Sequence, residues 1–183
     1  MKQPPSDNGE RRFFIRAGHT QAMDLKRVLF AAVPPVAAAV IGGIGSKDAP
    51  VVYARLDKPT WAPPAELSGP AWTTLYGLIG TAGWRMYPKV SDRAKRLHLA
   101  QMTVNASWSW VFFTVKDKRK SLAVIATLDA LVAAELWAIR KEDPASAALL
   151  APYAGWIAFA TALNACVSEP TNERASAAHS HRF

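Results

Sequence analysis

Aromatic and amide side chains recur at helical spacing in three segments of the 183-residue chain. The three groups are Trp72 and Tyr76; Gln101, Asn105 and Trp108; and Tyr153, Trp156, Ala160 and Asn164. Residues three, four or seven positions apart share one face of a helix, so each group should project from a single face. Indole and phenol rings can stack on a flat molecule, and amides can hydrogen-bond to it. These faces therefore predict the walls of a ligand pocket.

Other roles remain open for some of these residues. Asn164 could equally form a hydrogen bond between two helices, since an amide in hydrocarbon needs a partner. Trp72, Trp84 and Trp137 lie near the ends of their segments, where tryptophan commonly marks the boundary with lipid headgroups. Trp156 and Asn105 lie deeper, where a boundary role fits less well.

The segments that carry these residues have almost no charge. Residues 28–46, 67–84, 97–115 and 144–168 contain no Asp, Glu, Lys or Arg, and residues 121–139 contain only Asp129 and Glu135. Each run approaches the roughly 17–25 residues that a helix needs to span a bilayer. We therefore predict an all-α, polytopic membrane protein with a bundle of five transmembrane helices, at about 28–46, 65–86, 97–115, 121–140 and 147–167.

The alternative is a soluble helical bundle, which the mean hydropathy of +0.01 and the many small alanines would allow. A soluble helix of this length would, however, carry a charged face toward water. The polar segments at the two ends of the chain lower the average. We interpret residues 1–27 as a basic, disordered tail near lipid headgroups and residues 168–183 as a polar tail. Because of its five predicted spans, we expect the protein to be an integral, multi-pass membrane protein that contacts the bilayer.

Several kinds of chemistry are not indicated. His19, His98, His179 and His181 are scattered, and Cys166 is the single cysteine, so no metal-ligand spacing is present. We expect no metal, no catalytic residue and no required cofactor. Lys and Arg outnumber Asp and Glu by 22 to 14, but the basic residues lie beside the ends of the predicted helices, so nucleic acid is not an expected partner.

The two acids of the fourth predicted helix, Asp129 and Glu135, are six residues apart and should lie on different faces. One of them could be paired across the bundle or exposed to water. Neither is given a catalytic role.

The first connection contains the stretch LDKPTWAPP, residues 56–64. Each proline fixes one backbone dihedral and restricts the residue before it, so the loop should be stiff. We predict that it holds Trp61 as a lid over one end of the bundle, with Pro63 and Pro64 in the first turn of the second helix. Arg55 and Lys58 could meet the acidic groups of a ligand there, or remain solvated loop charges.

Four motifs occur together: LDKPTWAPP, GPAWTTLYGLIG, NASWSWVFF and PYAGWIAFATALN. In their order and spacing they resemble the translocator protein / tryptophan-rich sensory protein family, once called peripheral benzodiazepine receptors. The resemblance covers about residues 28–167 and neither tail. It implies a five-helix transmembrane bundle, often dimeric, and Gly77, Gly80 and Gly83 offer a small-residue surface that would suit a homodimer or packing within the bundle.

The resemblance also implies a ligand, namely a porphyrin or other tetrapyrrole such as protoporphyrin IX or haem, bound under the first loop. The residues that it places at the pocket are Trp61, Trp72, Tyr76, Asn105, Tyr153, Trp156 and Ala160. The expected function is that of a membrane sensor, scavenger or carrier. Sterol or lipid binding is less favoured, because Ala165 and Glu169 occupy positions where a family sterol motif needs a tyrosine and a basic residue.

Two other functions follow from the same reasoning. Some bacterial members are reported to promote light-dependent porphyrin breakdown, and in that case Trp72 and Trp156 would be the reacting residues. The third alternative is a structural membrane subunit with an empty bundle, which would bind no small molecule.

Overall fold

The computed structural model describes residues 8–115 and 117–167, with side chains from Ala22 onward except at position 118. All the regular elements in this part of the chain are helices or helical turns, joined by loops. Its elements are α1 (Asn8–Gly45), α2 (Ala49–Arg55), η1 (Ala65–Leu67), α3 (Ser68–Met86), α4 (Asp92–Trp110), the π-turn η2 (Val111–Val115), α5 (Lys118–Ile139) and α6 (Pro144–Cys166).

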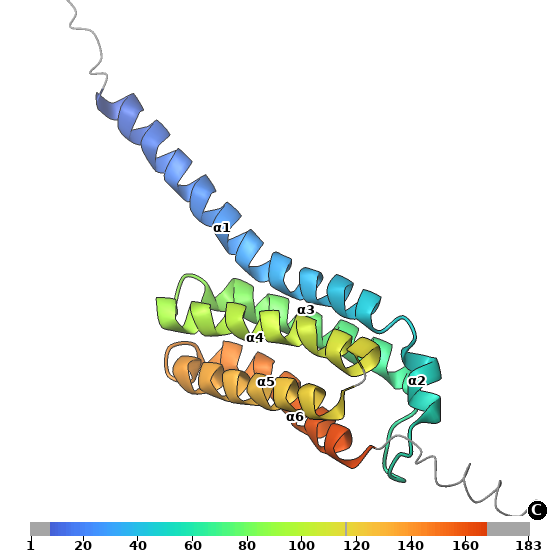
Figure 1. Cartoon of the computed structure of the whole chain (residues 1–183). Helices are drawn as coiled ribbons and strands as arrows, with labels where there is room; N and C mark the ends of the chain where they lie inside the picture. Colours follow the sequence, from blue (N-terminus) through green and yellow to red (C-terminus); the bar gives the residue numbers. More distant parts are fainter. Residues whose placement is uncertain (1–7, 116, 168–183) are drawn as a thin grey trace, which may run out of the picture.

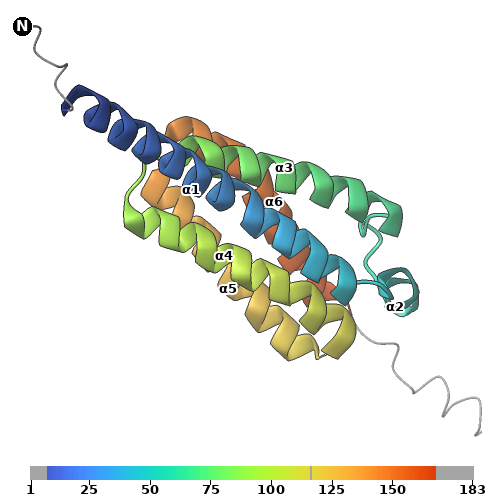
Figure 2. The same cartoon turned by 90° about the horizontal axis from the view of Figure 1, so that it is seen from above.

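The five long helices form a closed ring. α1 packs against α3 and α4, α4 against α5, α5 against α6, and α6 against α3. Short connections make α4 antiparallel to α3 and to α5, and α5 antiparallel to α6. The short helix α2 lies at one end of the bundle, and the α3–α4 and α5–α6 turns lie at the other, as Figure 1 and Figure 2 show.

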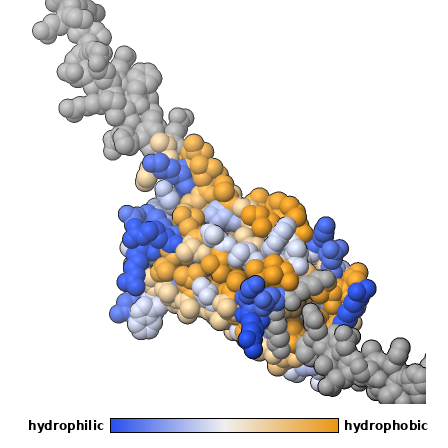
Figure 3. Space-filling view, in the orientation of Figure 1, coloured by the Kyte–Doolittle hydropathy of each residue, from blue (hydrophilic) through white to orange (hydrophobic). Residues whose placement is uncertain are grey.

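The outer surface of the bundle is apolar. Three segments are long and apolar enough to cross a membrane, namely Ala22–Gly45, Arg119–Ile139 and Pro144–Cys166. α3 and α4 are of similar length, but α4 owes its lower hydropathy partly to His98, Gln101 and Asn105, which point into the bundle. Figure 3 shows apolar residues over the middle of one face and hydrophilic residues toward its ends. The predicted all-helical membrane bundle is therefore confirmed.

Several boundaries differ from the sequence-based prediction. α4 begins at Asp92 rather than about 97, and α5 and α6 each begin about three residues early. α1 begins at Asn8, although residues 1–27 were predicted to be a disordered tail, and Figure 1 shows its first half running beyond the bundle. A charge-free run indicates which part of a helix can contact lipid. It does not mark the end of the helix, because charged residues such as Lys, Arg and Glu also favour helix formation. Residues 1–7 and 168–183 of the two predicted tails lie outside the described part.

The helical turn η1 begins at Ala65 and runs directly into α3 at Ser68. Pro64 is the extended residue before η1, so Pro63 and Pro64 precede the first turn in which they were predicted. Pro70, rather than Pro63 or Pro64, occupies the first turn of α3, where the missing backbone donor has no partner in the helix in any case.

Small residues bring α1 close to its neighbours. A Cβ at Gly45 would lie 3.0 Å from the backbone of Trp110, and one at Gly83 would lie 3.3 Å from the Cα of Ala31. One at Gly80 would lie 3.2 Å from the carbonyl oxygen of Ala31, whereas Gly77 meets nothing within 4 Å. The small-residue surface therefore packs partly within the bundle, and the homodimer stays a prediction.

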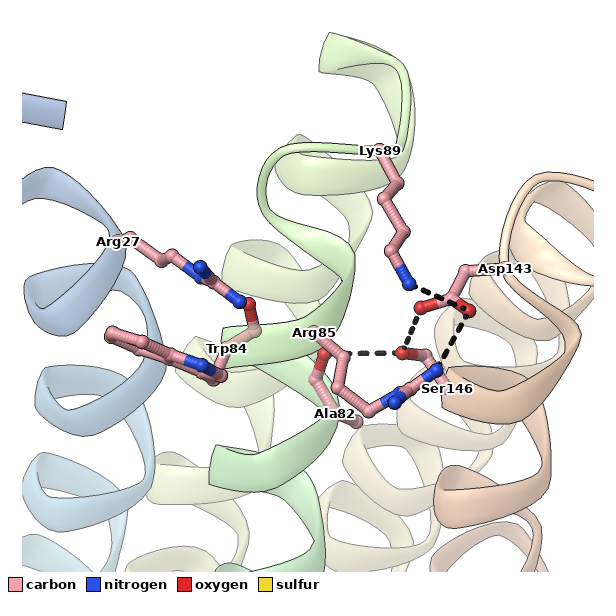
Figure 4. Close-up of polar contacts among 7 residues, drawn as sticks. All are labelled: Arg27, Ala82, Trp84, Arg85, Lys89, Asp143 and Ser146. Atoms are coloured by element: carbon pink, nitrogen blue, oxygen red, sulfur yellow. Dashed lines mark hydrogen bonds and ion pairs between the residues drawn. The ribbon is translucent and has the colours of Figure 1, made fainter. Parts of the chain in front are cut away.

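The end of the bundle opposite α2 is held by polar contacts, shown in Figure 4. The carboxylate of Asp143, before α6, accepts a 2.6 Å hydrogen bond from Ser146 Oγ and lies 3.5 Å from both Arg85 and Lys89. Ser146 Oγ also lies 3.3 Å from the carbonyl oxygen of Ala82 on α3. The cluster therefore ties the start of α6 to the end of α3.

Tryptophans at this end carry arginines on their faces. The guanidinium carbon of Arg27 lies 3.9 Å from the Trp84 ring, and that of Arg140 lies 3.2 Å from the Trp137 ring. Arg27 also donates to the carbonyl oxygen of Trp84 (Figure 4). This pairing of indole and cation is what a headgroup boundary favours.

Asp143 should make stability depend on pH. The hydrogen bond from Ser146, followed by the charges of Lys89 and Arg85, lowers the pKa of Asp143 against the opposing effect of burial. A carboxyl group with a lowered folded-state pKa stabilises the fold fully above its unfolded pKa of about 3.9, and this stabilisation is lost as pH falls through the folded value. We expect Asp143→Asn to lower the thermal unfolding midpoint in detergent at pH 7.

The difference in midpoint between the wild type and Asp143→Asn should narrow as the pH is lowered from about 5. Asp92→Asn is the control, because the Asp92 side chain is largely exposed and pairs only with Lys95 three residues away. A difference that is the same at pH 7 and at low pH would contradict a role for the Asp143 carboxylate.

Candidate functional site

A cavity of about 430 Å³ lies at the α2 end of the bundle. It is bounded by α1, α3, α4, η2 and α6, and by the first loop through Tyr53, Pro63 and Pro64. Its walls are mainly apolar, and its aromatic side chains are Tyr53, Trp72, Tyr76, Trp108, Phe112, Phe113, Trp156 and Phe159. The volume falls within the roughly 300–1,000 Å³ of small-molecule sites.

The first loop is fixed over this cavity by its own contacts. Tyr53 on α2 donates from its hydroxyl to the carbonyl oxygen of Pro63 over 2.9 Å. The Lys58 ammonium donates to the carbonyl oxygens of Tyr53 and Leu56 and lies 4.8 Å from the Tyr53 ring. Burial raises the pKa of Tyr53, so the phenol stays protonated and keeps donating. Lys58 thus stabilises the loop, and neither it nor Arg55 lines the cavity.

Trp72 is the centre of the aromatic wall. Its ring stacks on Tyr76 at 5.4 Å and meets Trp156 and Tyr153 edge-on at 6.3 and 6.4 Å. Trp156 in turn lies 5.7 Å from Phe159. Aromatic pairs of this kind contribute about 0.5–1.5 kcal/mol each beyond burial, so the wall should be formed before any ligand binds.

A chain of hydrogen bonds lies behind this wall. Tyr76 donates from its hydroxyl to Asn105 Oδ1 over 2.9 Å, and Asn105 Nδ2 donates to the hydroxyl of Tyr153 over 3.1 Å. The Tyr153 hydroxyl then donates to Gln101 Oε1 over 2.9 Å. We call Tyr76, Asn105, Tyr153 and Gln101 the polar file. It joins α3, α4 and α6.

Two buried donors at the cavity have no protein acceptor among the described residues. They are Trp108 Nε1 and Asn164 Nδ2. The oxygen of the same amide, Asn164 Oδ1, accepts from Ser121 over 3.3 Å, so Asn164 also forms the helix–helix bond that the sequence allowed. A buried donor without a partner costs roughly 1–3 kcal/mol, and a ligand with acceptor atoms would remove that cost.

The predicted pocket residues divide into three groups. Those that line the cavity are Trp72, Tyr76, Trp108, Trp156, Ala160 and Asn164. Asn105 and Tyr153 are buried behind the wall in the polar file. Trp61 is 48% exposed and contacts Phe159 edge-on at 5.7 Å, so it lies at the margin of the site. Their roles in binding remain predictions.

Some lining residues were missed by sequence reasoning. Tyr53 lies on a short helix inside what was read as a loop, and Phe112 and Phe113 follow α4 in the π-turn, where counting along a regular helix no longer gives the face. Phe159 lies three residues after Trp156, at a spacing that could have identified it.

The two acids of α5 have different environments. Asp129 accepts a 2.6 Å hydrogen bond from Thr161 on α6 and is half-buried. Glu135 is fully buried and pairs across the bundle with His98 on α4, with 2.7 Å between Oε1 and Nδ1. Within the described residues no group of three or more His, Cys, Asp or Glu side chains could hold a metal ion.

Removal of the central amide of the polar file should destabilise the bundle. Asn105→Ala takes the acceptor from Tyr76 and the donor from Tyr153, so we expect a loss of about 1–3 kcal/mol and a lower unfolding midpoint in detergent. Thr103→Ala is the control, because Thr103 is exposed and bonds only within its own helix. Equal midpoints for the two variants would contradict the structural role of the file.

Comparisons with known proteins agree with this architecture. The TspO/MBR family profile matches residues 30–169. The chain is 37% identical over 113 residues to the tryptophan-rich sensory protein of Cereibacter sphaeroides, covering 61% of this chain and 72% of that protein. It is 40% identical over 115 residues to the tryptophan-rich protein TspO of Archaeoglobus fulgidus, covering 61% and 74%. It is 32% identical over 121 residues to the human translocator protein, covering 63% and 72%. With five long helices in a membrane bundle and a profile match over most of its length, this chain belongs to the TspO/MBR family.

Proposed function

We propose that this protein binds a tetrapyrrole, protoporphyrin IX or haem, in the cavity beneath the first loop, and acts as a sensor, scavenger or carrier in the membrane. The observation that carries the proposal is an aromatic-walled cavity with two unpaired buried N–H donors, Trp108 Nε1 and Asn164 Nδ2. Membership of the family supports it.

The chemistry of the lining fits the ring of such a ligand. A tetrapyrrole is a wide, flat, mainly apolar molecule with carboxylates on one edge, and it would stack on the faces of Trp72, Trp156 or Phe112. Trp108 and Asn164 would donate to its acceptor atoms, and Ser46 and Ser68 supply hydroxyls at the cavity.

The lining also limits the mode of binding. The lining residues include no His, Cys or Met side chain and no Lys or Arg. Tyrosine can also ligate haem iron, but the hydroxyls of the two lining tyrosines, Tyr53 and Tyr76, donate to Pro63 and Asn105. The ring would therefore be held by stacking and hydrogen bonds. On this basis, protoporphyrin IX without a metal should bind about as well as haem.

Titration of protoporphyrin IX into protein in lipid nanodiscs, followed by tryptophan fluorescence, tests the site. Trp108→Phe keeps an aromatic ring and removes one donor worth about 0.5–1.5 kcal/mol, so we expect binding about 2–10 times weaker. Trp137→Phe is the matched control, because Trp137 is 70% exposed at the opposite end of the bundle. Saturable binding with the same affinity in both variants would count against this cavity, and the absence of saturable binding would favour a purely structural subunit.

A second candidate function is light-dependent breakdown of the bound porphyrin. The observation that favours it is the contact between Trp72 and Trp156 at 6.3 Å, with Tyr76 stacked on Trp72, because these rings can give up one electron. The excited porphyrin would take one electron from Trp72, which leaves an indole radical cation. The reduced ring would pass the electron to molecular oxygen, and the reduced oxygen species formed would be the oxidant that opens the ring.

Illumination of the complex in air, followed by the porphyrin absorption band, tests this function. The double variant Trp72→Phe, Trp156→Phe keeps the aromatic wall, so the band should fade more slowly than in the wild type at equal bound porphyrin. Equal rates of fading would leave binding as the function of the site.

A further inference from the structure

A buried ionisable pair lies deeper in the bundle than the cavity. His98 of α4 and Glu135 of α5 are both 0% exposed, and 2.7 Å separates His98 Nδ1 from Glu135 Oε1. Neither residue lines the cavity. Ionisable groups at such depth are unfavourable in a membrane protein and generally mark a functional site.

The surroundings of the pair are apolar on two sides. The Phe30 ring of α1 lies 5.0 Å from the imidazole ring, and a Cβ at Gly83 of α3 would lie 3.5 Å from His98 Nε2. Among the described residues no Lys or Arg forms an ion pair with Glu135. The pair therefore consists of two ionisable side chains with no lysine or arginine ion pair among the described residues.

Other titratable groups near the pair are already engaged. Tyr153 from α6 and Tyr76 from α3 belong to the polar file, and Asp129, on another face of α5, accepts from Thr161. Tyr87 packs on the Phe30 ring and has Lys95 over its own ring. On α1 Arg27 donates to the carbonyl oxygen of Trp84, and on α3 Arg85 pairs with Asp143.

The hydrogen-bonding capacity of the pair is not filled. His98 Nε2, Glu135 Oε2 and Gln101 Nε2 are buried without a protein partner among the described residues. A buried ion pair with a purely structural role is expected to have its remaining donors and acceptors satisfied. Here an acceptor on Glu135 and a donor on Gln101 stay open on the packed helices α4 and α5.

Charge accounting gives the number of protons on the pair. A carboxylate beside a neutral imidazole would leave one uncompensated negative charge in a low-dielectric interior, whereas one more proton makes the pair neutral. This proton gives either an imidazolium and a carboxylate or an imidazole and a carboxylic acid, so it belongs to the pair rather than to one residue. Addition of a second proton would again leave a net charge.

The polar file runs from the cavity toward the pair, although among the described residues no hydrogen bond joins Gln101 to His98 or Glu135. On α4, Gln101 lies one turn beyond His98, and Asn105 lies seven residues beyond it, a rise of about 10 Å. Gln101 accepts from Tyr153, which accepts from Asn105, which accepts from Tyr76, and Tyr76 lines the cavity.

We propose that His98 and Glu135 form an intramembrane proton-binding site that holds one proton at neutral pH, and that the polar file links this site to the cavity. The ligand of the site is a proton, and the site does not depend on which molecule occupies the cavity. Any molecule that alters the Tyr76 end of the file changes the affinity of the pair for its proton, and the pair changes the affinity for that molecule by the same factor.

Two spectroscopic readouts together count the proton in full-length protein in nanodiscs. The ¹⁵N signals of labelled histidine distinguish imidazolium from neutral imidazole, and the infrared C=O stretch reports a protonated carboxyl group. We expect to observe either the imidazolium signals or the carboxylic acid band. The signal observed should stay constant between about pH 5 and 8 and should be lost in Glu135→Gln. The variant His98→Asn identifies which imidazole signals belong to His98. A neutral His98 together with an ionised Glu135 at neutral pH would overturn the proposal.

Asp129→Asn is the matched control, because Asp129 is the other acid of α5 and bonds only to Thr161. Asp129→Asn should leave the His98 signals and the Glu135 band unchanged. If the carboxylic acid band were lost in Asp129→Asn and kept in Glu135→Gln, the proton would belong to Asp129, and the proposal would be overturned.

Tyr153→Phe tests the connection, because it removes the hydroxyl between Asn105 and Gln101. We expect the signals of the pair to shift in this variant although Tyr153 does not contact the pair directly. Unchanged signals would overturn the link to the cavity, whereas protoporphyrin IX binding, measured separately, tests the proposed function without reference to the pair.

Discussion

A polar side chain inside a bilayer has no water to bond with, so it must find a partner within the protein. In this bundle the partners come from different helices. Asn105 of α4 bonds to Tyr76 of α3 and Tyr153 of α6, and Ser121 of α5 bonds to Asn164 of α6. Because van der Waals packing between apolar helices is weakly directional, these bonds fix which helix faces meet, and they place Trp72 and Trp156 side by side in the cavity wall.

The same constraint explains the shape of the site. Within the polar file, Tyr76, Asn105 and Tyr153 bond to one another, and the aromatic rings cover the file on the cavity side. Among the described residues the donors of Trp108 and Asn164 have no protein partner, and both residues line the cavity beneath the first loop. The loop itself is held by Tyr53 and Lys58 through backbone carbonyl oxygens, so the roof of the cavity needs little ordering when a ligand enters.

The sequence predicted the helical membrane bundle well because the absence of charge over long runs is a direct requirement of hydrocarbon. It placed Trp72, Tyr76 and Trp156 near one another because helical spacing defines faces. The sequence could not show that Asn105 and Tyr153 lie behind the wall. Spacing identifies which residues share a helix face, but it does not give the rotation of that helix relative to the other helices. Phe112 and Phe113 were missed because the π-turn changes the residue count per turn.

Glu135 illustrates a different limit. Its position in an apolar helix indicated a special environment, but nothing in the sequence connects it to His98, which lies 37 residues earlier on another helix. The start of α1 at Asn8 shows another limit. The charge pattern indicates which residues lie in the membrane, whereas local helix propensity decides where the helix begins. Long-range pairing is decided by the packing of the ring α1–α3–α6–α5–α4, which only the structure reveals.

The central claim is that the cavity beneath the first loop is the ligand site, and the indole N–H resonances of the seven tryptophans test it most directly. With protein in nanodiscs and protoporphyrin IX as the probe, saturable shifts should be largest for Trp108, which has an unpaired donor at the cavity, and for Trp72 and Trp156 in its wall. Trp84 and Trp137 at the opposite end should not shift. Shifts confined to Trp84 and Trp137, or equal shifts at all seven, would contradict the account.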